Sequence, residues 1–242
     1  MKTLIFGGAA EGRQLAGLVP ALGHDVTVQV ATELGAEELK GCPCRDRTGR
    51  LDAREMTELV RGFDLVIDAT HPYAAEASRN IRQACRAADV PLRRVLRAAS
   101  EPGDCVRVRS CGEAAAYLEG KPGNVLIATG SKELPAYGCL DPGRLYPRVL
   151  PTHEALSVCE KLGIAHSHIL ALQGPFSLEM NAAMLRQYRI RYLVTKDGGK
   201  QGGFEEKREA ARRCGAELVL VARPEDSGIS MEELMAELEG MA

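Results

Sequence analysis

Residues 4–13 read LIFGGAAEGR, in which a short apolar run leads directly into a glycine-rich turn. A helical pattern follows the turn, because Leu15, Leu18, Val19 and Leu22 recur at intervals of about one helical turn. Backbone amides in such a turn, together with the positive end of the helix macrodipole, form a site for a pyrophosphate group. The strand, turn and helix therefore predict a nucleotide-binding unit built on a parallel sheet.

A second informative segment is LVIDATHPYA, residues 65–74. It reads as a buried strand whose carboxyl end carries Thr70, His71 and Tyr73, and strand ends on that edge of an open parallel sheet line the ligand crevice. A purely structural interpretation also accounts for part of it, since Thr70 suits a helix N-cap and Pro72 suits a first helical turn. For His71, capping and an active-site role remain equally open.

Apolar strand-like runs alternate with helical periodicity along nearly the whole chain. In the first series the expected strands are 3–6, 25–30, 65–68 and 92–96, and the main helices follow residue 13 and cover 52–61 and 73–88. In the second series the expected strands are 106–109, 124–128, 145–150, 169–172, 190–195 and 218–221, with helices at 113–119, 152–162, 178–187, 204–214 and from 230.

The pattern breaks once, near residues 99–104, where the sequence SEPG interrupts the alternation. Short continuous apolar strands separated by helices are typical of parallel sheets covered on both faces. The prediction is an α/β chain of two Rossmann-like domains, residues 1–99 and 100–242, with mainly parallel sheets flanked by helices.

Composition excludes several classes of function. The 242 residues carry a net charge of −2, so no general basic field favours nucleic acid. The few aromatic residues are not interleaved with basic ones, which argues against a groove for single-stranded nucleic acid. No apolar run approaches the ~20 residues needed to span a bilayer. We therefore expect neither a nucleic-acid nor a membrane partner.

The eight cysteines are scattered apart from Cys42 and Cys44, and they lack the paired spacing of a zinc site. The chain also enters its first strand without a charged and apolar leader. These features predict reduced thiols, no metal site and a cytoplasmic location.

The glycines at 7, 8 and 12 depart from the usual G-x-G-x-x-G spacing, so a tight turn without a ligand is the alternative. If the turn holds a coenzyme, Glu11 lies in the first helical turn to brace the loop. Arg13 then reaches a phosphate or a substrate carboxylate.

The end of the second expected strand bears on the choice of coenzyme. An acidic residue about 20 positions after the turn favours NAD, whereas a nearby Arg favours NADP. Glu33 lies somewhat late, and Thr32 suits either ribose, so the preference for NAD is slight.

Polar segments also follow three strands of the second series: TGSKE at 129–133, QGPFS at 173–177 and TKDGGKQGG at 195–203. The glycines of the last segment predict a lid over a ligand, with simple solvated charge as the alternative for its lysines. Arg79, Arg82 and Arg86 share a helix face opposite the apolar stripe, and we expect that face to be solvated. The basic residues near strand ends are better candidates for carboxylate binding: Lys132, Arg148 and Lys196.

Together these segments resemble the precorrin-6A reductases, including the cobalt-precorrin-6A reductases of the anaerobic cobalamin route. The resemblance rests on segments that occur in the same order, namely 7–13, 67–74, 130–133, 148–151 (RVLP), 172–177 (LQGPFS) and 194–197 (VTKD). Two departures are Ala9, where the family often has Thr, and Gly198, where we expect Ser.

The resemblance implies NADPH or NADH on one domain and a tetrapyrrole in the cleft between the two. Hydride would pass to a ring double bond, and a proton would be added at the adjacent carbon. The implied coenzyme residues are Gly7, Gly8, Ala9, Glu11, Gly12, Arg13, Thr32, Ala69, Thr70 and Pro72. The implied substrate residues are Tyr73, Lys132, Arg148, Gln173, Ser177, Lys196 and Asp197. His71 is the candidate proton donor, with water as the alternative.

Two other classes of function start from the same glycine turn. One is a non-catalytic dinucleotide-sensing module, and the other is an S-adenosylmethionine-dependent methyltransferase. The second set of polar strand ends favours the reductase over the sensing module. The start of the helix at Glu11 favours the reductase over the methyltransferase. Transient contacts with neighbouring pathway enzymes are the only protein partners expected.

Overall fold

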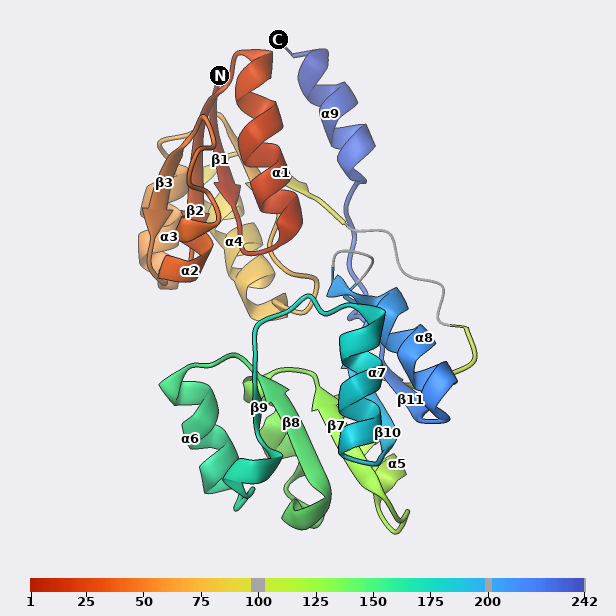
Figure 1. Ribbon diagram of the computed structural model, residues 1–242. Coiled ribbons are helices and arrows are strands. Elements are labelled where there is room, and N and C mark those ends of the chain that lie inside the picture. The colour runs from red at the N-terminus through yellow and green to blue at the C-terminus, as the bar shows by residue number, and fades with distance from the viewer. Residues whose placement is uncertain (97–102, 199–201, 242) are drawn as a thin grey trace. The chain divides into compact units, whose positions relative to one another are not determined.

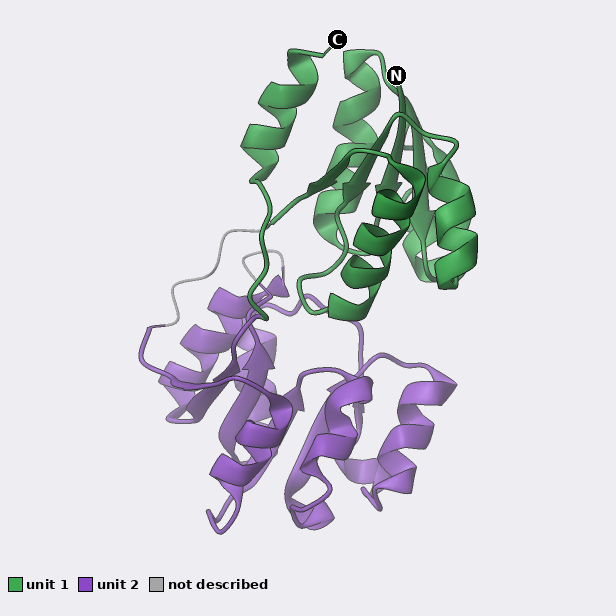
Figure 2. Cartoon of the chain, turned by 180° about the vertical axis from the view of Figure 1, so that it is seen from behind, with its two compact units in different colours: residues 1–98, 224–242 green, residues 99–223 purple. Residues whose placement is uncertain are grey.

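The computed structural model describes residues 1–96, 103–198 and 202–241. The chain divides into two compact units (Figure 2): unit 1 comprises residues 1–98 and 224–242, and unit 2 comprises residues 99–223. Each unit contains its own parallel sheet with helices around it. The predicted fold class, α/β with two Rossmann-like sheets, is confirmed.

The sheet of unit 1 has the strand order β3-β2-β1-β4-β5, and every pairing is parallel. Its strands are β1 (Lys2–Phe6), β2 (Asp25–Val30), β3 (Arg45–Thr48), β4 (Leu65–Asp68) and β5 (Leu92–Arg94). The chain changes direction across the sheet between β1 and β4, which is where open α/β sheets bind ligands. The register pairs Phe6 with Asp68, so the segments after these two strands start side by side.

Both faces of this sheet are covered (Figure 1). Successive strand residues face opposite sides, so Ile5 packs with Leu15 on one face and Leu4 packs with Met56 and Ile81 on the other. The covering helices are α1 (Ala10–Leu18), the 3-10 turn η1 (Val19–Leu22), α2 (Glu33–Glu37), α3 (Ala53–Val60), α4 (Ala75–Ala88) and α9 (Met231–Glu239).

The end of the chain belongs to unit 1, although the sequence placed all of 100–242 in the second domain. Ile229 forms a parallel bridge with Val95 and donates its amide to the Arg94 carbonyl at 2.9 Å. Helix α9 lies beside α1 (Figure 1). It buries Leu234 and Leu238 in the core that contains Leu15. The sequence did not predict this return, because the apolar face of a helix does not show which of two cores it covers. The edge of β5 offers unpaired peptide groups, with which the returning segment forms its hydrogen bonds.

The sheet of unit 2 has the order β6-β11-β10-β7-β8-β9, again entirely parallel. Its strands are β6 (Val106–Val108), β7 (Asn124–Ala128), β8 (Leu145–Val149), β9 (Leu170–Ala171), β10 (Ile190–Lys196) and β11 (Glu217–Val221). Its helices are α5 (Cys111–Leu118), α6 (His153–Lys161), α7 (Leu178–Gln187) and α8 (Phe204–Cys214), with the 3-10 turns η2 (Ser131–Tyr137), η3 (Pro142–Arg144) and η4 (His166–His168). Val125 packs into one core and Leu126 into the core on the opposite face.

Most expected elements are present, and several differ at their ends. Helix α4 begins at Ala75 and not at residue 73, and β5 ends at Arg94 and not at residue 96. Strand β3 and helix α2 were not predicted. Part of the expected domain break at 99–104 and the middle of the glycine-rich loop at 195–203 lie outside the described residues.

Across the described ranges, no helix is both long and apolar enough to cross a membrane. The eight cysteines are free thiols. Burial raises the pKa of the Cys85 thiol to about 11, and the charge of Asp68 adds to the shift. Cys85 is therefore protonated at neutral pH.

Candidate functional site

The turn between β1 and α1 requires glycine at two positions for different reasons. Gly8 has a φ of +124°, and the space where its side chain would lie is open. A Cβ on Gly12 would lie 2.9 Å from the Cα of Gly7, so only glycine lets the helix pack this closely on the turn. Ala9 is the N-cap and offers no side-chain hydrogen bond to the helix. The turn thus has the close packing and the uncapped helix start that suit a pyrophosphate.

The other predicted coenzyme residues lie on the same edge of the unit 1 sheet. Glu11 is buried in the first turn of α1, and Arg13 is exposed one turn into the helix. Thr32 follows β2, is exposed, and accepts a hydrogen bond from the amide of Gly35 at 3.2 Å as the N-cap of α2. The Ala69 amide donates to the Phe6 carbonyl at 3.0 Å, which holds the end of β4 beside the turn.

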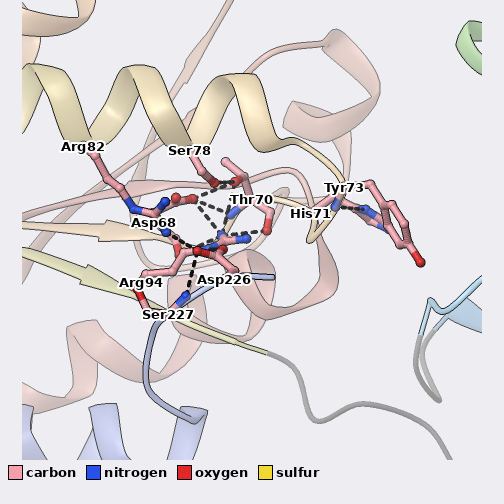
Figure 3. A network of polar contacts seen from close by, with 9 residues as sticks. All are labelled: Asp68, Thr70, His71, Tyr73, Ser78, Arg82, Arg94, Asp226 and Ser227. Atoms are coloured by element: carbon pink, nitrogen blue, oxygen red, sulfur yellow. Dashed lines mark hydrogen bonds and ion pairs between the residues drawn. The ribbon is translucent and has the colours of Figure 1, made fainter. Parts of the chain in front are cut away.

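The segment after β4 is held by a buried polar network (Figure 3). Asp68 is fully buried, and its Oδ1 accepts from the Thr70 amide at 3.0 Å and from the Thr70 hydroxyl at 2.7 Å. The Thr70 hydroxyl also lies 3.1 Å from the Ser78 Oγ. The alternative interpretation of Thr70 as a helix N-cap is wrong, because α4 starts later and its N-cap, Ala74, has no side-chain bond. Thr70 instead shapes the strand end.

Arg94 of β5 completes this network, and sequence reasoning missed it. Its Nη1 donates to Asp68 Oδ1 at 2.9 Å and to the Thr70 carbonyl at 2.9 Å. Its Nε donates to Asp226 Oδ2 at 2.9 Å, so one guanidinium joins the end of β4 to the returning chain. The available signal was weak: Arg94 lies in the expected strand 92–96, next to Arg93 and before Val95 and Leu96.

Arg82 also bonds to Asp226, which corrects the expectation that its helix face is simply solvated. Burial alone would raise the pKa of Asp226, but hydrogen bonds from Arg82 and Arg94 outweigh it and hold the pKa below its usual value. Asp226 is therefore an ionised partner for both arginines.

A surface pocket of about 720 Å³ lies along the outer side of β5, lined in part by Arg82, Arg93 and Gly228. It contains no predicted site residue. Arg93 pairs with Glu237 there, as Arg82 does with Asp226, so carboxylates already balance these cations.

His71 and Tyr73 project away from this network (Figure 3). The Tyr73 amide donates to His71 Nδ1 at 3.3 Å, and the two rings lie 5.6 Å apart between centroids. Because Nδ1 accepts this bond, the hydrogen of the neutral imidazole is on Nε2. Both side chains are half-buried.

In unit 2, Arg148 projects from β8 among neutral partners. Its Nη1 donates to Asn181 Oδ1 at 2.8 Å, and its guanidinium lies 4.6 Å from the centroid of the Phe176 ring. Burial lowers the pKa of Arg148 to about 10. Asn181 also donates to the Ser177 carbonyl at 2.8 Å, so Arg148 is tied to the predicted 173–177 segment.

The ends of β7 and β10 are joined by an ion pair. Lys196 Nζ lies 2.8 Å from Glu133 Oε1, which links the 129–133 and 195–197 segments at the point where this sheet changes direction. Asp197 is buried and pairs with Arg223 at 3.0 Å.

The remaining predicted substrate residues of unit 2 are exposed. Lys132 and Gln173 lie at the surface, and Ser177 caps α7 by accepting from the Met180 amide at 3.2 Å. The structure therefore brings Arg148 to the 176–177 segment and Lys196 to Glu133, and it leaves Lys132 and Gln173 outside these clusters.

Lys207 of α8 is a second charged residue that sequence reasoning missed. Its Nζ donates to the Gly202 carbonyl at 2.6 Å. Burial, and after it the charge of Arg148, lowers its pKa to about 8. The signal was its spacing, because residue 207 lies between Phe204 and Ala211 on the buried stripe of α8.

Comparisons with known proteins agree along the whole chain. The family model described as "Precorrin-6x reductase CbiJ/CobK" matches residues 2–239. A cobalt-precorrin-6A reductase of Priestia megaterium is 34% identical over 229 residues, covering 91% of this chain and 90% of the relative. One from Methanothermobacter thermautotrophicus is 37% identical over 233 residues, covering 93% and 77%.

A solved structure described as "CobK precorrin-6A reductase" matches with a TM-score of 0.80 at 26% identity, covering 99% of this chain and 97% of the other. The resemblance predicted from the sequence is confirmed. The chain belongs to the precorrin-6x reductase CbiJ/CobK family.

Proposed function

We propose that this chain reduces a precorrin-6A-type tetrapyrrole, either precorrin-6A or its cobalt form, with NADPH or NADH in cobalamin biosynthesis. The match of the reductase family across residues 2–239 carries this assignment. Relatives that cover nearly the same span are named cobalt-precorrin-6A reductases. The activity is thus an oxidoreductase reaction on a carbon–carbon bond of a macrocycle.

The coenzyme is assigned to unit 1, where the glycine turn offers backbone amides to a pyrophosphate. The close approach of Gly12 to Gly7 supports this assignment, because it seats the helix start directly behind the turn. Bound there, the coenzyme supplies the hydride. The residues assigned to hold it are Gly7, Gly8, Ala9, Glu11, Gly12, Arg13, Thr32, Ala69, Thr70 and Pro72.

The macrocycle is assigned to the strand ends of unit 2. Precorrins carry several carboxylates, and Arg and Lys bind carboxylates through charge-assisted hydrogen bonds. Arg148 is the best supported anchor because it is buried at a strand end among neutral partners. The other assigned residues of unit 2 are Lys132, Gln173, Ser177, Lys196 and Asp197, and Tyr73 of unit 1 is assigned to the macrocycle as well. A substrate cleft between the two units stays a prediction.

His71 is proposed as the proton donor to the carbon next to the one that receives hydride. Its Nε2–H is the hydrogen-bond donor of the neutral ring when the Tyr73 amide bonds to Nδ1. Direct protonation by water is the alternative. Asp68, Thr70 and Arg94 act at a distance from this step, by fixing the segment that carries the imidazole.

The test is to incubate the purified chain with precorrin-6A or cobalt-precorrin-6A and each coenzyme in turn. We expect loss of the reduced-nicotinamide absorbance only when a macrocycle is present, with a matching change in the macrocycle spectrum. Coenzyme binding without oxidation by either macrocycle would overturn the proposal in favour of a sensing module. A thermal shift with S-adenosylmethionine and none with a dinucleotide would indicate a methyltransferase.

A further inference from the structure

Two cationic side chains of unit 2 meet the same short stretch of backbone and ring atoms. Arg148 is buried against the Phe176 ring, and a Cβ on Gly203 would lie 4.0 Å from the Phe176 carbonyl oxygen. Lys207 is half-buried and bonds to Gly202, the residue before Gly203. Arg148 comes from β8 and Lys207 from α8. The partners of Arg148 are the Asn181 amide oxygen, the Met184 sulfur at 3.6 Å and the Phe176 ring. The partner of Lys207 is the Gly202 carbonyl. Among the described residues, neither cation takes part in an ion pair.

The two cations act on each other electrostatically. The positive charge of Arg148 disfavours the charged form of Lys207, whereas Glu206 and Asp197 favour it. Burying two like charges this way is costly, and structures tolerate it where an opposite charge completes the site.

The neighbouring carboxylates do not fill that role. Asp197 is paired with Arg223. Glu206 Oε2 is buried, and no described residue gives it a hydrogen bond. Among the described residues, neither of these carboxylates forms an ion pair with Arg148 or Lys207.

The unused donors suit a carboxylate. Only Nη1 of the Arg148 guanidinium is bonded within the described part of the chain, so Nε and Nη2 retain their hydrogens for a ligand. Lys207 adds a compact ammonium that commits one hydrogen to Gly202 and keeps two. A planar anion held by a guanidinium edge and an ammonium is a common carboxylate arrangement.

We propose that Arg148 and Lys207 together form one carboxylate site and hold a single acidic side chain of the macrocycle. The proposal rests on the proposed function for the identity of the ligand. It adds Lys207, which lies outside every segment that carries the family resemblance, as a substrate-binding residue. A phosphate of the coenzyme has related chemistry, so the test separates the two sources.

The decisive variants are Lys207→Met, which removes the charge at similar length, and Lys207→Arg, which retains it. Lys161→Met is the control, because Lys161 is an exposed cation at the end of α6 in the same unit. Each full-length variant is titrated with cobalt-precorrin-6A without coenzyme, and KM for macrocycle and coenzyme are measured separately.

We expect Lys207→Met to raise Kd and KM for the macrocycle roughly 10- to 100-fold, with KM for the coenzyme unchanged. Lys207→Arg should recover most of the affinity, and Lys161→Met should behave as wild type. An unchanged macrocycle Kd in Lys207→Met overturns the proposal. A rise confined to KM for the coenzyme also overturns it and points to a phosphate.

Two further measurements keep the result interpretable. If the lysine serves a ligand and not the fold, Lys207→Met should match or exceed the Tm of the wild type, because it removes a half-buried charge that forms no ion pair among the described residues. A marked fall in Tm would instead indicate a structural role and count against the proposal.

Citrate, used as a simple carboxylate in thermal-shift titration, should stabilise the wild type more than Lys207→Met even if no macrocycle is turned over. A citrate response that is equal in the two proteins overturns the proposed carboxylate site, whereas a wild type without turnover overturns only the proposed function.

Discussion

Arg94 Nη1 lies 2.9 Å from Asp68 Oδ1, and the two side chains are 4% and 0% exposed. The same nitrogen donates to the Thr70 carbonyl. Arg94 of β5 therefore holds the backbone of the segment that follows the adjacent strand, β4. Charged pairs this deeply buried add little net stability by themselves. Removing one partner is nevertheless destabilising, because the other partner is left buried without it. This pair therefore makes the Thr70–Tyr73 segment sensitive to position 94.

Replacing Arg94 with Met should lower the free energy of unfolding by about 3–5 kcal/mol, because the fully buried Asp68 carboxyl group loses its arginine partner. Urea denaturation monitored by circular dichroism measures this change. Arg86→Met, at an exposed position on α4, is the matched control and should stay within about 0.5 kcal/mol of wild type. A loss below about 1 kcal/mol for Arg94→Met would show that the pair does not hold the segment.

Adding one methyl group at Gly12 should weaken coenzyme binding at least roughly tenfold, because the new Cβ meets the Gly7 Cα at 2.9 Å. The control is Gly17→Ala on the same helix, where the added Cβ meets open space. That change should leave coenzyme affinity intact and stabilise the protein by about 0.4–1 kcal/mol. Fluorescence titration with NADPH and NADH reports both affinities, and equal affinities for the two variants would count against the turn as the coenzyme site.

Stability should increase with pH above about 8 through Lys207. Its pKa is about 8 in the folded protein and 10.5 without burial. The unfolded chain therefore holds more protons than the folded chain between these values, and stability rises with pH in that window. Arg148, Glu206 and Asp197 are the charged groups that act on this lysine.

The measurement is urea unfolding at pH 7.5 and at pH 9.5 for wild type and Lys207→Met. The increase should be smaller in the variant, which has no ammonium to neutralise. Macrocycle affinity of the wild type should fall over the same range, since the neutral amine no longer attracts a carboxylate. Parallel pH profiles for the two proteins would remove Lys207 as the group responsible.

Substituting His71 with Ala should slow single-turnover reduction by roughly 10²- to 10⁴-fold if the imidazole delivers the proton. Coenzyme affinity should change little, because the glycine turn is untouched. His153→Ala, an exposed histidine at the start of α6, serves as the control. Near-normal single-turnover reduction in His71→Ala would assign protonation to water.

The regular part of the fold was predictable because the apolar periodicity there agrees with the glycines and capping residues that begin or end each element. Strand β2 and helices α7 and α8 have the predicted bounds, and α8 ends at a glycine with a φ of +68°. Strand β3 escaped prediction because its sequence, RDRT, has no apolar residue, and it is held by backbone pairing with β2. Tertiary pairing outweighed local propensity at that edge.

The glycine turn and the strand ends were recognisable as candidate sites because they lie next to apolar strands in the sequence. Arg94 and Lys207 were not recognised, since their importance depends on partners far away along the chain or on burial. Arg94 meets Asp226, which is 132 positions distant. Long-range contacts of this kind leave almost no local trace in the sequence.

The return of residues 224–242 to unit 1 means that unit 2 is inserted into the chain of unit 1. During synthesis on the ribosome, every residue of unit 2 emerges before α9 does. Unit 1 therefore completes its core only after unit 2 has emerged, because Leu234 and Leu238 follow unit 2 in the chain.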